Sequence, residues 1–403
     1  MQKNPEATED AHFLNRLFFV PKLASAAEPT FRVAVTLAIL LFLATRFSVL
    51  AIFAARDYHI LGSDSGNYIA IADFIRENGR LPNTDTTSSR QYPGLALLMA
   101  AVTPIFGSTV VAGYFVSGLA AIGSLILFHA LFRNFRLTLL YVVFVPSWVA
   151  SSSLIMSEGP TFLLMLTAIW ALHRESLLPR RLFFLFVAGF IMVVRNTAAI
   201  FLIPFIVAWW WEQERKQYGW NRLFAYALAT AALPLVYLSW NWFTLGELYP
   251  QLRAQHAFIT ANAQGGFPER ALTWPGQALI HALGINGIPL AKKLSVVCSL
   301  SLGIAVTLRY FFRSTGTVTR DLARPFAYAS FLHLAFHLCI GGSFGFSSID
   351  RYVSHINPVL AKGVAGERQI RWFWLILATL VGILFAGLTG HSNTALIPFL
   401  KPD

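Results

Sequence analysis

Four short polar segments could do chemistry in this chain, and each interrupts a strongly apolar sequence. The first, residues 56–73, follows a long apolar run directly and carries two carboxylates, Asp57 and Asp64. A carboxylate held in a fixed position can act as the general base that takes a proton from an attacking hydroxyl group. Apolar residues recur at spacings of three and four after Asp64, which predicts a helix, and Asp is also a favoured N-cap residue. Asp64 is the leading candidate for the base, because Asp57 could simply pair with the adjacent Arg56.

Two further segments, Ser157–Glu158 and Arg195–Asn196–Thr197, each place a charge between apolar stretches. An ionisable group near a membrane boundary is costly unless it has a partner, so both are functional candidates. A phosphate or carboxylate of a substrate would serve as the partner of Arg195. The alternatives are a solvated turn at Glu158 and, for Arg195, an internal salt bridge with Glu158 or Asp64.

The fourth segment, Asp350–Arg351–Tyr352, lies at the expected outer end of a short apolar stretch. Arg351 and Tyr352 could bind a phosphate and an apolar chain. The alternative is an ordinary Asp–Arg turn beside an interfacial aromatic anchor.

No metal and no other cofactor is predicted. The chain lacks a glycine-rich phosphate loop, a His-Glu-x-x-His pair and a Cys-x-x-Cys motif. His333 and His337 are spaced to share one helix face, but no third ligand is evident, so a packing role is expected. Cys298 and Cys339 lie in apolar runs and are expected to be buried thiols.

The composition puts these segments in a membrane protein. Of the 403 residues, 56% are hydrophobic and 12% are charged, whereas a soluble domain carries about 25% charged residues. Apolar runs near the length of a bilayer span recur along the chain. The net charge of +12 does not indicate nucleic acid as a partner. Most Lys and Arg lie in short loops, which the positive-inside rule assigns to one side of a membrane.

The expected fold is all-α, a multi-pass transmembrane bundle of about 11 spans. The first span is 32–54, and Arg46 inside it is expected to have a structural partner. Residues 94–106 are too short to span and are interrupted at Thr103–Pro104, so an interfacial or re-entrant helix is expected. The other spans are expected at about 109–132, 137–155, 159–172, 182–194, 198–211, 222–243, 291–312, 325–341, 355–366 and 372–390.

This topology also defines the domains. Residues 1–31 form a cytoplasmic N-terminal segment, and 32–403 form a single transmembrane domain with its C-terminus outside. The long outer loops are 56–108, which carries the interfacial helices, and 244–290. The other three polar segments are expected on the same outer face as Asp64, because every Lys- and Arg-rich loop then falls inside.

The order of these motifs resembles the GT-C superfamily of membrane glycosyltransferases. It is most similar to the branch with lipid-linked-sugar mannosyltransferases of the glycosylphosphatidylinositol pathway and related bacterial enzymes. Asp64 with Tyr68 and Ala72 matches an Asp of the first outer loop that precedes a Tyr and a helix. Tyr92–Pro93 matches a Tyr-Pro that leads a hydrophobic helix.

The later motifs follow in the same order. Pro146 with Ser157–Glu158 matches a Pro followed by Ser-Glu before an apolar run, and Arg351–Tyr352 precedes a Pro as in the family. Arg195–Asn196–Thr197 matches an Arg-Ser-Asn-Gly-like turn in part, without the Gly. Ser63 stands before Asp64 where the family carries an acid or Trp.

The resemblance implies a reaction and a site. A sugar, mannose in the closest branch, moves from a polyprenyl-phosphate donor to a hydroxyl of a glycan, lipid or protein acceptor on the outer or lumenal face, with inversion. Asp64 is the implied general base. The implied substrate contacts are Asp57, Tyr68, Tyr92, Glu158, Arg195, Arg351 and Tyr352. No cofactor is implied, because cationic side chains can stabilise the phosphate leaving group.

A transporter or flippase of a lipid-linked saccharide is the alternative, and a non-catalytic membrane partner is a third reading. A transporter would more often show internal repeats and charges near the midplane of several helices. Only Arg46 lies clearly deep in a span, and the other polar groups gather at one face, which favours the enzyme. The expected location is a bacterial inner membrane, whose lipids surround the protein, with the active site on the outer face.

Overall fold

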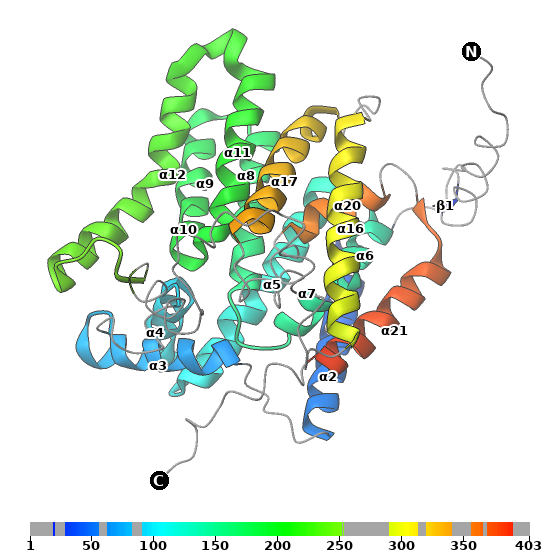
Figure 1. Cartoon of the computed structure of the whole chain (residues 1–403), viewed down its shortest axis with the longest axis horizontal. Coiled ribbons are helices and arrows are strands. Elements are labelled where there is room, and N and C mark those ends of the chain that lie inside the picture. The colour runs from blue at the N-terminus through cyan, green and yellow to red at the C-terminus, as the bar shows by residue number, and fades with distance from the viewer. Residues whose placement is uncertain are drawn as a thin grey trace.

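A bundle of helices makes up nearly all of the structure (Figure 1). The computed structural model describes residues 19–20, 29–55, 63–82, 91–251, 253, 290–312, 320–340, 356–365 and 369–389. In chain order the helices are α2 (Phe31–Ala55), α3 (Ser63–Asn78), α4 (Gly94–Phe106), α5 (Thr109–Phe132), α6 (Phe135–Val143), α7 (Pro146–Ser151), α8 (Glu158–Arg174), α9 (Leu178–Gly189), α10 (Ile191–Val194), α11 (Asn196–Trp209), the π-helix η2 (Trp210–Glu214), α12 (Arg215–Leu245), α16 (Leu290–Phe312), α17 (Arg320–Ile340), α20 (Asn357–Ala365) and α21 (Trp372–Thr389). Two short strands, β1 (Phe19–Val20) and β2 (Gln369–Ile370), pair antiparallel. Apart from this pair, the expected helical fold is confirmed.

Three helical stretches are long and apolar enough to cross a membrane: Phe31–Ala55, Thr109–Phe132 and Asn196–Leu245. The third comprises more than one helix, because the backbone leaves the helical region at Gly219, where φ is 61° and ψ is −159°. The indole Nε1 of Trp210 donates a hydrogen bond to the Gly219 carbonyl oxygen (2.9 Å) and so closes this bend. These apolar helices indicate a membrane-associated protein.

Several of the predicted segments coincide with helices. The helices at 31–55, 94–106 and 109–132 match their predicted ranges to within one residue at each end. The α4 helix has 13 residues, fewer than the roughly 20 that a comfortable span needs. Pro104 was expected to interrupt this segment. It lies in the last turn of α4 instead, and the helix continues to Phe106. The helix ends at Gly107, whose left-handed conformation (φ 69°) provides the cap.

The predicted span at 137–155 is wrong as a single helix. The α6 helix ends at Val143, and the six-residue helix α7 begins at Pro146. A proline disfavours the helical conformation in the residue before it, and Val145 is accordingly extended (φ −110°, ψ 115°). The chain then runs through irregular turns over residues 152–157 before α8 begins. This irregular segment delivers Ser157 and Glu158 to the site described below.

Basic residues near the ends of several helices gather at one end of the bundle. The contacts that join these segments are Arg174 Nη2 to the Leu131 carbonyl oxygen (2.7 Å), Arg136 Nη1 to the Ile370 carbonyl oxygen (2.9 Å), Arg324 Nη1 to Glu212 Oε2 (2.8 Å), and the ion pair of Arg181 with Glu214. These contacts tie the end of α5 to the end of α8, the start of α6 to β2, and the starts of α9 and α17 to η2. We call this region the basic end.

Arg46 of α2 is buried and has the structural partners that the sequence predicted. Its Nε donates to Ser152 Oγ (2.8 Å), and its Nη1 donates to the Val142 carbonyl oxygen (3.0 Å). The guanidinium also lies over the Phe42 ring, 4.3 Å from its centroid. Arg46 therefore ties α2 to α6 and to the turn after α7.

Cys298 is exposed, whereas the sequence predicted a buried thiol. The thiol lies on the exposed face of α16, whereas the neighbouring Ser299 and Leu300 are buried. An apolar run does not tell which face of a helix is buried, because both faces of a membrane helix can be apolar.

Candidate active site

Asp64 lies in the first turn of α3, as the second residue of the helix. Asp64 is therefore not the N-cap residue of α3. Its carboxylate interacts favourably with the positive end of the helix dipole. Gln91 Nε2 donates a hydrogen bond to Asp64 Oδ1 (3.0 Å). Ser65 Oγ donates to the Ile155 carbonyl oxygen (3.0 Å), which pins the start of α3 to the irregular segment after α7. Asp64 is half-buried, and the hydrogen bond from Gln91 orients its carboxylate.

Tyr68 lies one turn beyond Asp64 on the buried face of α3. It packs in a cluster with Leu95 and Met99 of α4 and Val193 of α10. Its exposed fraction is 2%. This burial gives Tyr68 a clear packing role, in which it holds α3 against α4.

The segment Tyr92–Pro93–Gly94 starts α4 against α10. A Cβ at Gly94 would lie 2.7 Å from the Cα and N atoms of Val194, so only glycine permits this approach. The contact puts Tyr92 near the residues that follow Val194. The Tyr92 and Tyr249 ring centroids are 6.4 Å apart.

Tyr249 connects two of the predicted site segments. Its hydroxyl group lies close enough to the side chains of Tyr92 and Asn196 to interact with both. Burial raises the pKa of the Tyr249 hydroxyl above its ordinary value, so this group stays protonated at neutral pH. The tyrosine therefore bridges the start of α4 and the start of α11.

Arg195 and Glu158 form a buried ion pair. Arg195 Nη1 lies 2.9 Å from Glu158 Oε1, and it also donates to Ser157 Oγ (2.9 Å). The exposed fractions are 8% for Arg195 and 0% for Glu158. The internal salt bridge that the sequence left open as an alternative is thus present, and Glu158 is not in a solvated turn. A Cβ at Gly159 would lie 2.7 Å from the Ser117 carbonyl oxygen, so this glycine lets the start of α8 approach α5.

Two histidines of α17 lie on the side that packs against α11, the helix that begins beside Arg195. His333 and His337 are both buried, with ring centroids 4.5 Å apart. His337 is close enough to Arg195 for their charges to interact. The sequence predicted a packing role for both histidines, and their spacing of four residues showed a shared face. It did not indicate that this face meets the Arg195 segment.

The first turn of α11 holds buried oxygen atoms that lack hydrogen-bond partners in the part of the chain that the structure describes. They are Asn196 Oδ1 and Thr197 Oγ1. Buried polar atoms are nearly always satisfied by protein, water or a ligand. The region beside Arg195 is therefore suited to bind a further polar group.

Contacts and adjacent positions in the chain connect four of the eight predicted site residues: Asp64, Tyr92, Arg195 and Glu158. Asp64 binds Gln91, the neighbour of Tyr92, and Tyr92 binds Tyr249. Tyr249 binds Asn196, the neighbour of Arg195, and Arg195 binds Glu158. Gln91 and Tyr249 were not predicted, because a single polar residue in a loop carries no periodic signal. Three predicted site residues lie outside the described residues: Asp57, Arg351 and Tyr352.

This linked site and the basic end lie at opposite ends of the same helices. The α8 helix begins at Glu158 and ends at Arg174, and its 17 residues span about 25 Å. The α11 helix begins beside Arg195 and continues into η2, which carries the Glu212 and Glu214 carboxylates of the basic end. The bundle therefore has one end rich in arginine and another with the Asp64 and Glu158 carboxylates.

No known protein family, curated protein or solved structure matches this chain.

Proposed function

We propose that this chain is an integral membrane glycosyltransferase of the GT-C type, which transfers a sugar from a polyprenyl-phosphate donor to an acceptor hydroxyl group. The observation that carries the proposal is the linked set of polar contacts from Asp64 to Glu158. An oriented carboxylate on a half-buried residue lies at one end of that set and a buried ion pair at the other. The set lies at one end of an apolar bundle, where a site must lie if the donor's lipid tail is to stay in the bilayer.

The proposed topology has about 11 spans, with α3 and α4 as interfacial helices on the outer side. The arginines of the basic end support this topology, because the positive-inside rule assigns that end to the cytoplasm. Asp64 then faces the outer or lumenal side, and the proposed location is a bacterial inner membrane. The segments 56–108 and 244–290 form the two long outer loops.

Asp64 is the proposed general base. Gln91 donates to Oδ1 and so fixes the plane of the carboxylate. Asp64 takes the proton of the acceptor hydroxyl as its oxygen attacks the anomeric carbon of the sugar. The bond from that carbon to the phosphate oxygen breaks, the configuration inverts, and polyprenyl phosphate leaves with the electron pair. Mannose is the proposed sugar, and the acceptor is a glycan, lipid or protein hydroxyl.

Arg195 and Arg351 are the proposed cations for the phosphate leaving group. Because Glu158 already neutralises Arg195, we assign Arg195 chiefly to shaping the site through α8 and α11. Arg351, with Tyr352, then carries the direct phosphate contact. This division predicts that Arg351→Ala weakens donor use more than it weakens folding.

The experiment supplies purified protein with polyprenyl-phosphate sugars and with membrane lipid or glycan acceptors. Wild-type protein is expected to form the glycosylated acceptor, and Asp64→Asn is expected to reduce the rate by about 10²–10⁴-fold. Glu77→Gln is the matched control, since Glu77 is an exposed carboxylate on the same helix. Equal transfer by wild-type protein and Asp64→Asn would remove Asp64 as the base.

A further inference from the structure

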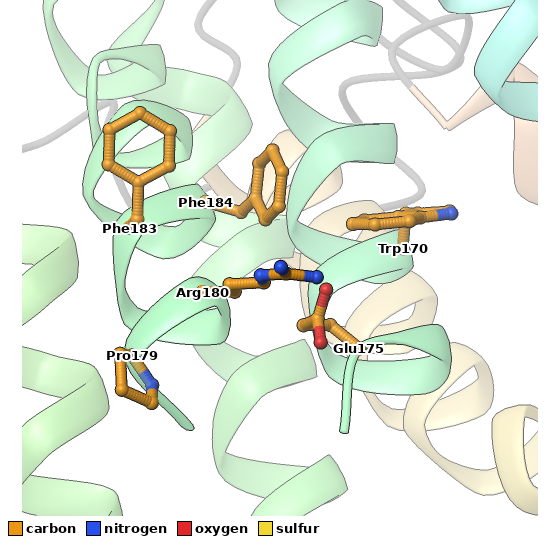
Figure 2. Close-up of a pocket in the computed structure, with 6 residues that line it drawn as sticks. All are labelled: Trp170, Glu175, Pro179, Arg180, Phe183 and Phe184. Atoms are coloured by element: carbon orange, nitrogen blue, oxygen red, sulfur yellow. The ribbon is translucent and has the colours of Figure 1, made fainter. Parts of the chain in front are cut away.

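A hollow of about 500 Å³ lies between the end of α8 and the start of α9, at the basic end of the bundle (Figure 2). It is lined by Trp170, Glu175, Pro179, Arg180, Phe183 and Phe184. Pockets for small ligands have volumes of roughly 300–1,000 Å³, so the hollow can hold a lipid headgroup. It lies about the length of α8 away from Glu158, and so it is separate from the proposed active site.

The hollow holds one carboxylate in a fixed position. Glu175 Oε1 accepts a hydrogen bond from the backbone N–H of Leu177 (3.0 Å). The Glu175 carbonyl oxygen accepts from Arg181 Nε (3.1 Å), which fixes the backbone of the same turn. The carboxylate is thus preorganised to accept a hydrogen bond from a ligand.

The hollow also holds a guanidinium group that is available for a ligand. Arg181 is occupied, because it pairs with Glu214 and donates to the Tyr226 hydroxyl oxygen (2.7 Å). Arg180 makes no hydrogen bond or ion pair with any residue that the structure describes. Figure 2 shows the Arg180 side chain of α9 and the side chain of Glu175, the residue after α8, pointing toward each other in the hollow.

Aromatic rings form the remaining wall. Trp170 and Phe184 meet edge to face with ring centroids 5.0 Å apart, and Phe183 contacts Phe184 at 5.6 Å. Phe183 is 59% exposed, although it belongs to a largely apolar helix. Aromatic rings beside charged groups at the ends of membrane helices are typical of the headgroup level of a bilayer.

We propose that this hollow binds a phospholipid whose headgroup carries both a phosphate and a primary ammonium group. Arg180 holds the phosphate through charge-assisted hydrogen bonds, and Glu175 accepts hydrogen bonds from the ammonium. The aromatic wall covers the start of the acyl chains. A trimethylammonium headgroup offers no N–H donor to Glu175, and an anionic headgroup without an amine is repelled by it.

The test uses the full-length protein in detergent micelles with a phosphatidylethanolamine that carries a photoactivatable acyl chain. Cross-linked residues are mapped by mass spectrometry. We expect adducts within residues 170–184, reduced about tenfold by Arg180→Gln and by Glu175→Gln. Arg215→Gln is the matched control, because Arg215 is an exposed cation of the basic end that stacks on Trp211, and its adducts should stay unchanged.

Competition with unlabelled lipids tests the headgroup assignment. Phosphatidylethanolamine should displace the probe at about tenfold lower concentration than phosphatidylglycerol or phosphatidylcholine does. Equal adducts in Arg180→Gln and wild-type protein would overturn the site. Equal competition by phosphatidylglycerol would overturn the role of Glu175, and equal competition by phosphatidylcholine would overturn recognition of a primary ammonium.

Discussion

The Glu158–Arg195 ion pair gives a structural partner to each of two residues that the sequence singled out as functional candidates. Each residue alone, between apolar stretches, predicts an external partner or an internal one, and the sequence does not decide between them. In the structure each charge is the other's partner, and both are buried. The pair thus joins the start of α8 to the junction of α10 and α11, and so it stabilises the packing of these helices.

We predict strong coupling between these two charges. Arg195→Met and Glu158→Gln should each destabilise the fold by about 3–5 kcal/mol, because each leaves an uncompensated buried group. The double variant should lose much less than the sum. Thermal unfolding in detergent measures the three values as a double-mutant cycle.

The exposed pair of Arg253 and Glu247 provides the control for that cycle. Its nitrogen and oxygen atoms are 2.6 Å apart, but the Arg253 side chain is 61% exposed. Arg253→Met should therefore change stability by less than about 1 kcal/mol. Additive losses at Arg195 and Glu158 would contradict the assigned ion pair.

For the individual helices, the length of each apolar run predicted the position of a helix better than it predicted where a helix breaks. The ranges of α2, α4 and α5 follow from hydropathy alone, because each run ends at polar or glycine residues. The break between α6 and α7 was missed although Val145–Pro146 signals it, since a search for long spans gives a single proline too little weight. The junction of α9 and α10 at Phe190 has no comparable signal.

The contact of α4 with α10 depends on Gly94. We predict that Gly94→Ala destabilises the protein by about 1–3 kcal/mol, because the added methyl group would overlap the Val194 backbone. The change should also lower transfer activity, since it displaces Tyr92 from Tyr249. Thermal unfolding and the transfer assay measure both effects.

Gly118→Ala is the control for this contact. Gly118 lies within α5, and a Cβ there meets nothing within 4 Å. Replacing a helical glycine with alanine should stabilise the protein by roughly 0.5–1 kcal/mol. Similar effects of the two substitutions would show that α4 and α10 are not closely packed at Gly94.

In the molecule as a whole, the arginines of the basic end are separated from the polar residues of the Asp64–Glu158 site. The arginines of the basic end and the Asp64–Glu158 site lie at opposite ends of α8 and α11. The charge pattern of the loops predicted this separation, because positive charge is retained on the cytoplasmic side. The contacts that link the site segments were not predictable, since they join positions far apart in the chain through residues such as Gln91 and Tyr249.

The proposed topology predicts that α4 does not cross the membrane. A reporter enzyme fused after residue 135 should therefore be cytoplasmic, whereas one fused after residue 81 should be outside. Activity of a periplasmic and of a cytoplasmic reporter at each position measures this. An outside location after residue 135 would mean that α4 crosses and that the basic end faces outward.

The most direct test of the account separates donor binding from sugar transfer in Asp64→Asn. Donor affinity is measured with a polyprenyl-phosphate sugar in the absence of acceptor, and transfer is measured in a single turnover with the donor saturating. The proposed role of Asp64 as general base predicts an unchanged Kd for the donor and a transfer rate lower by about 10²–10⁴-fold, because only the base is lost. An unchanged rate of transfer from bound donor would contradict it, as would transport of the intact lipid-linked saccharide by the wild-type protein without transfer of its sugar.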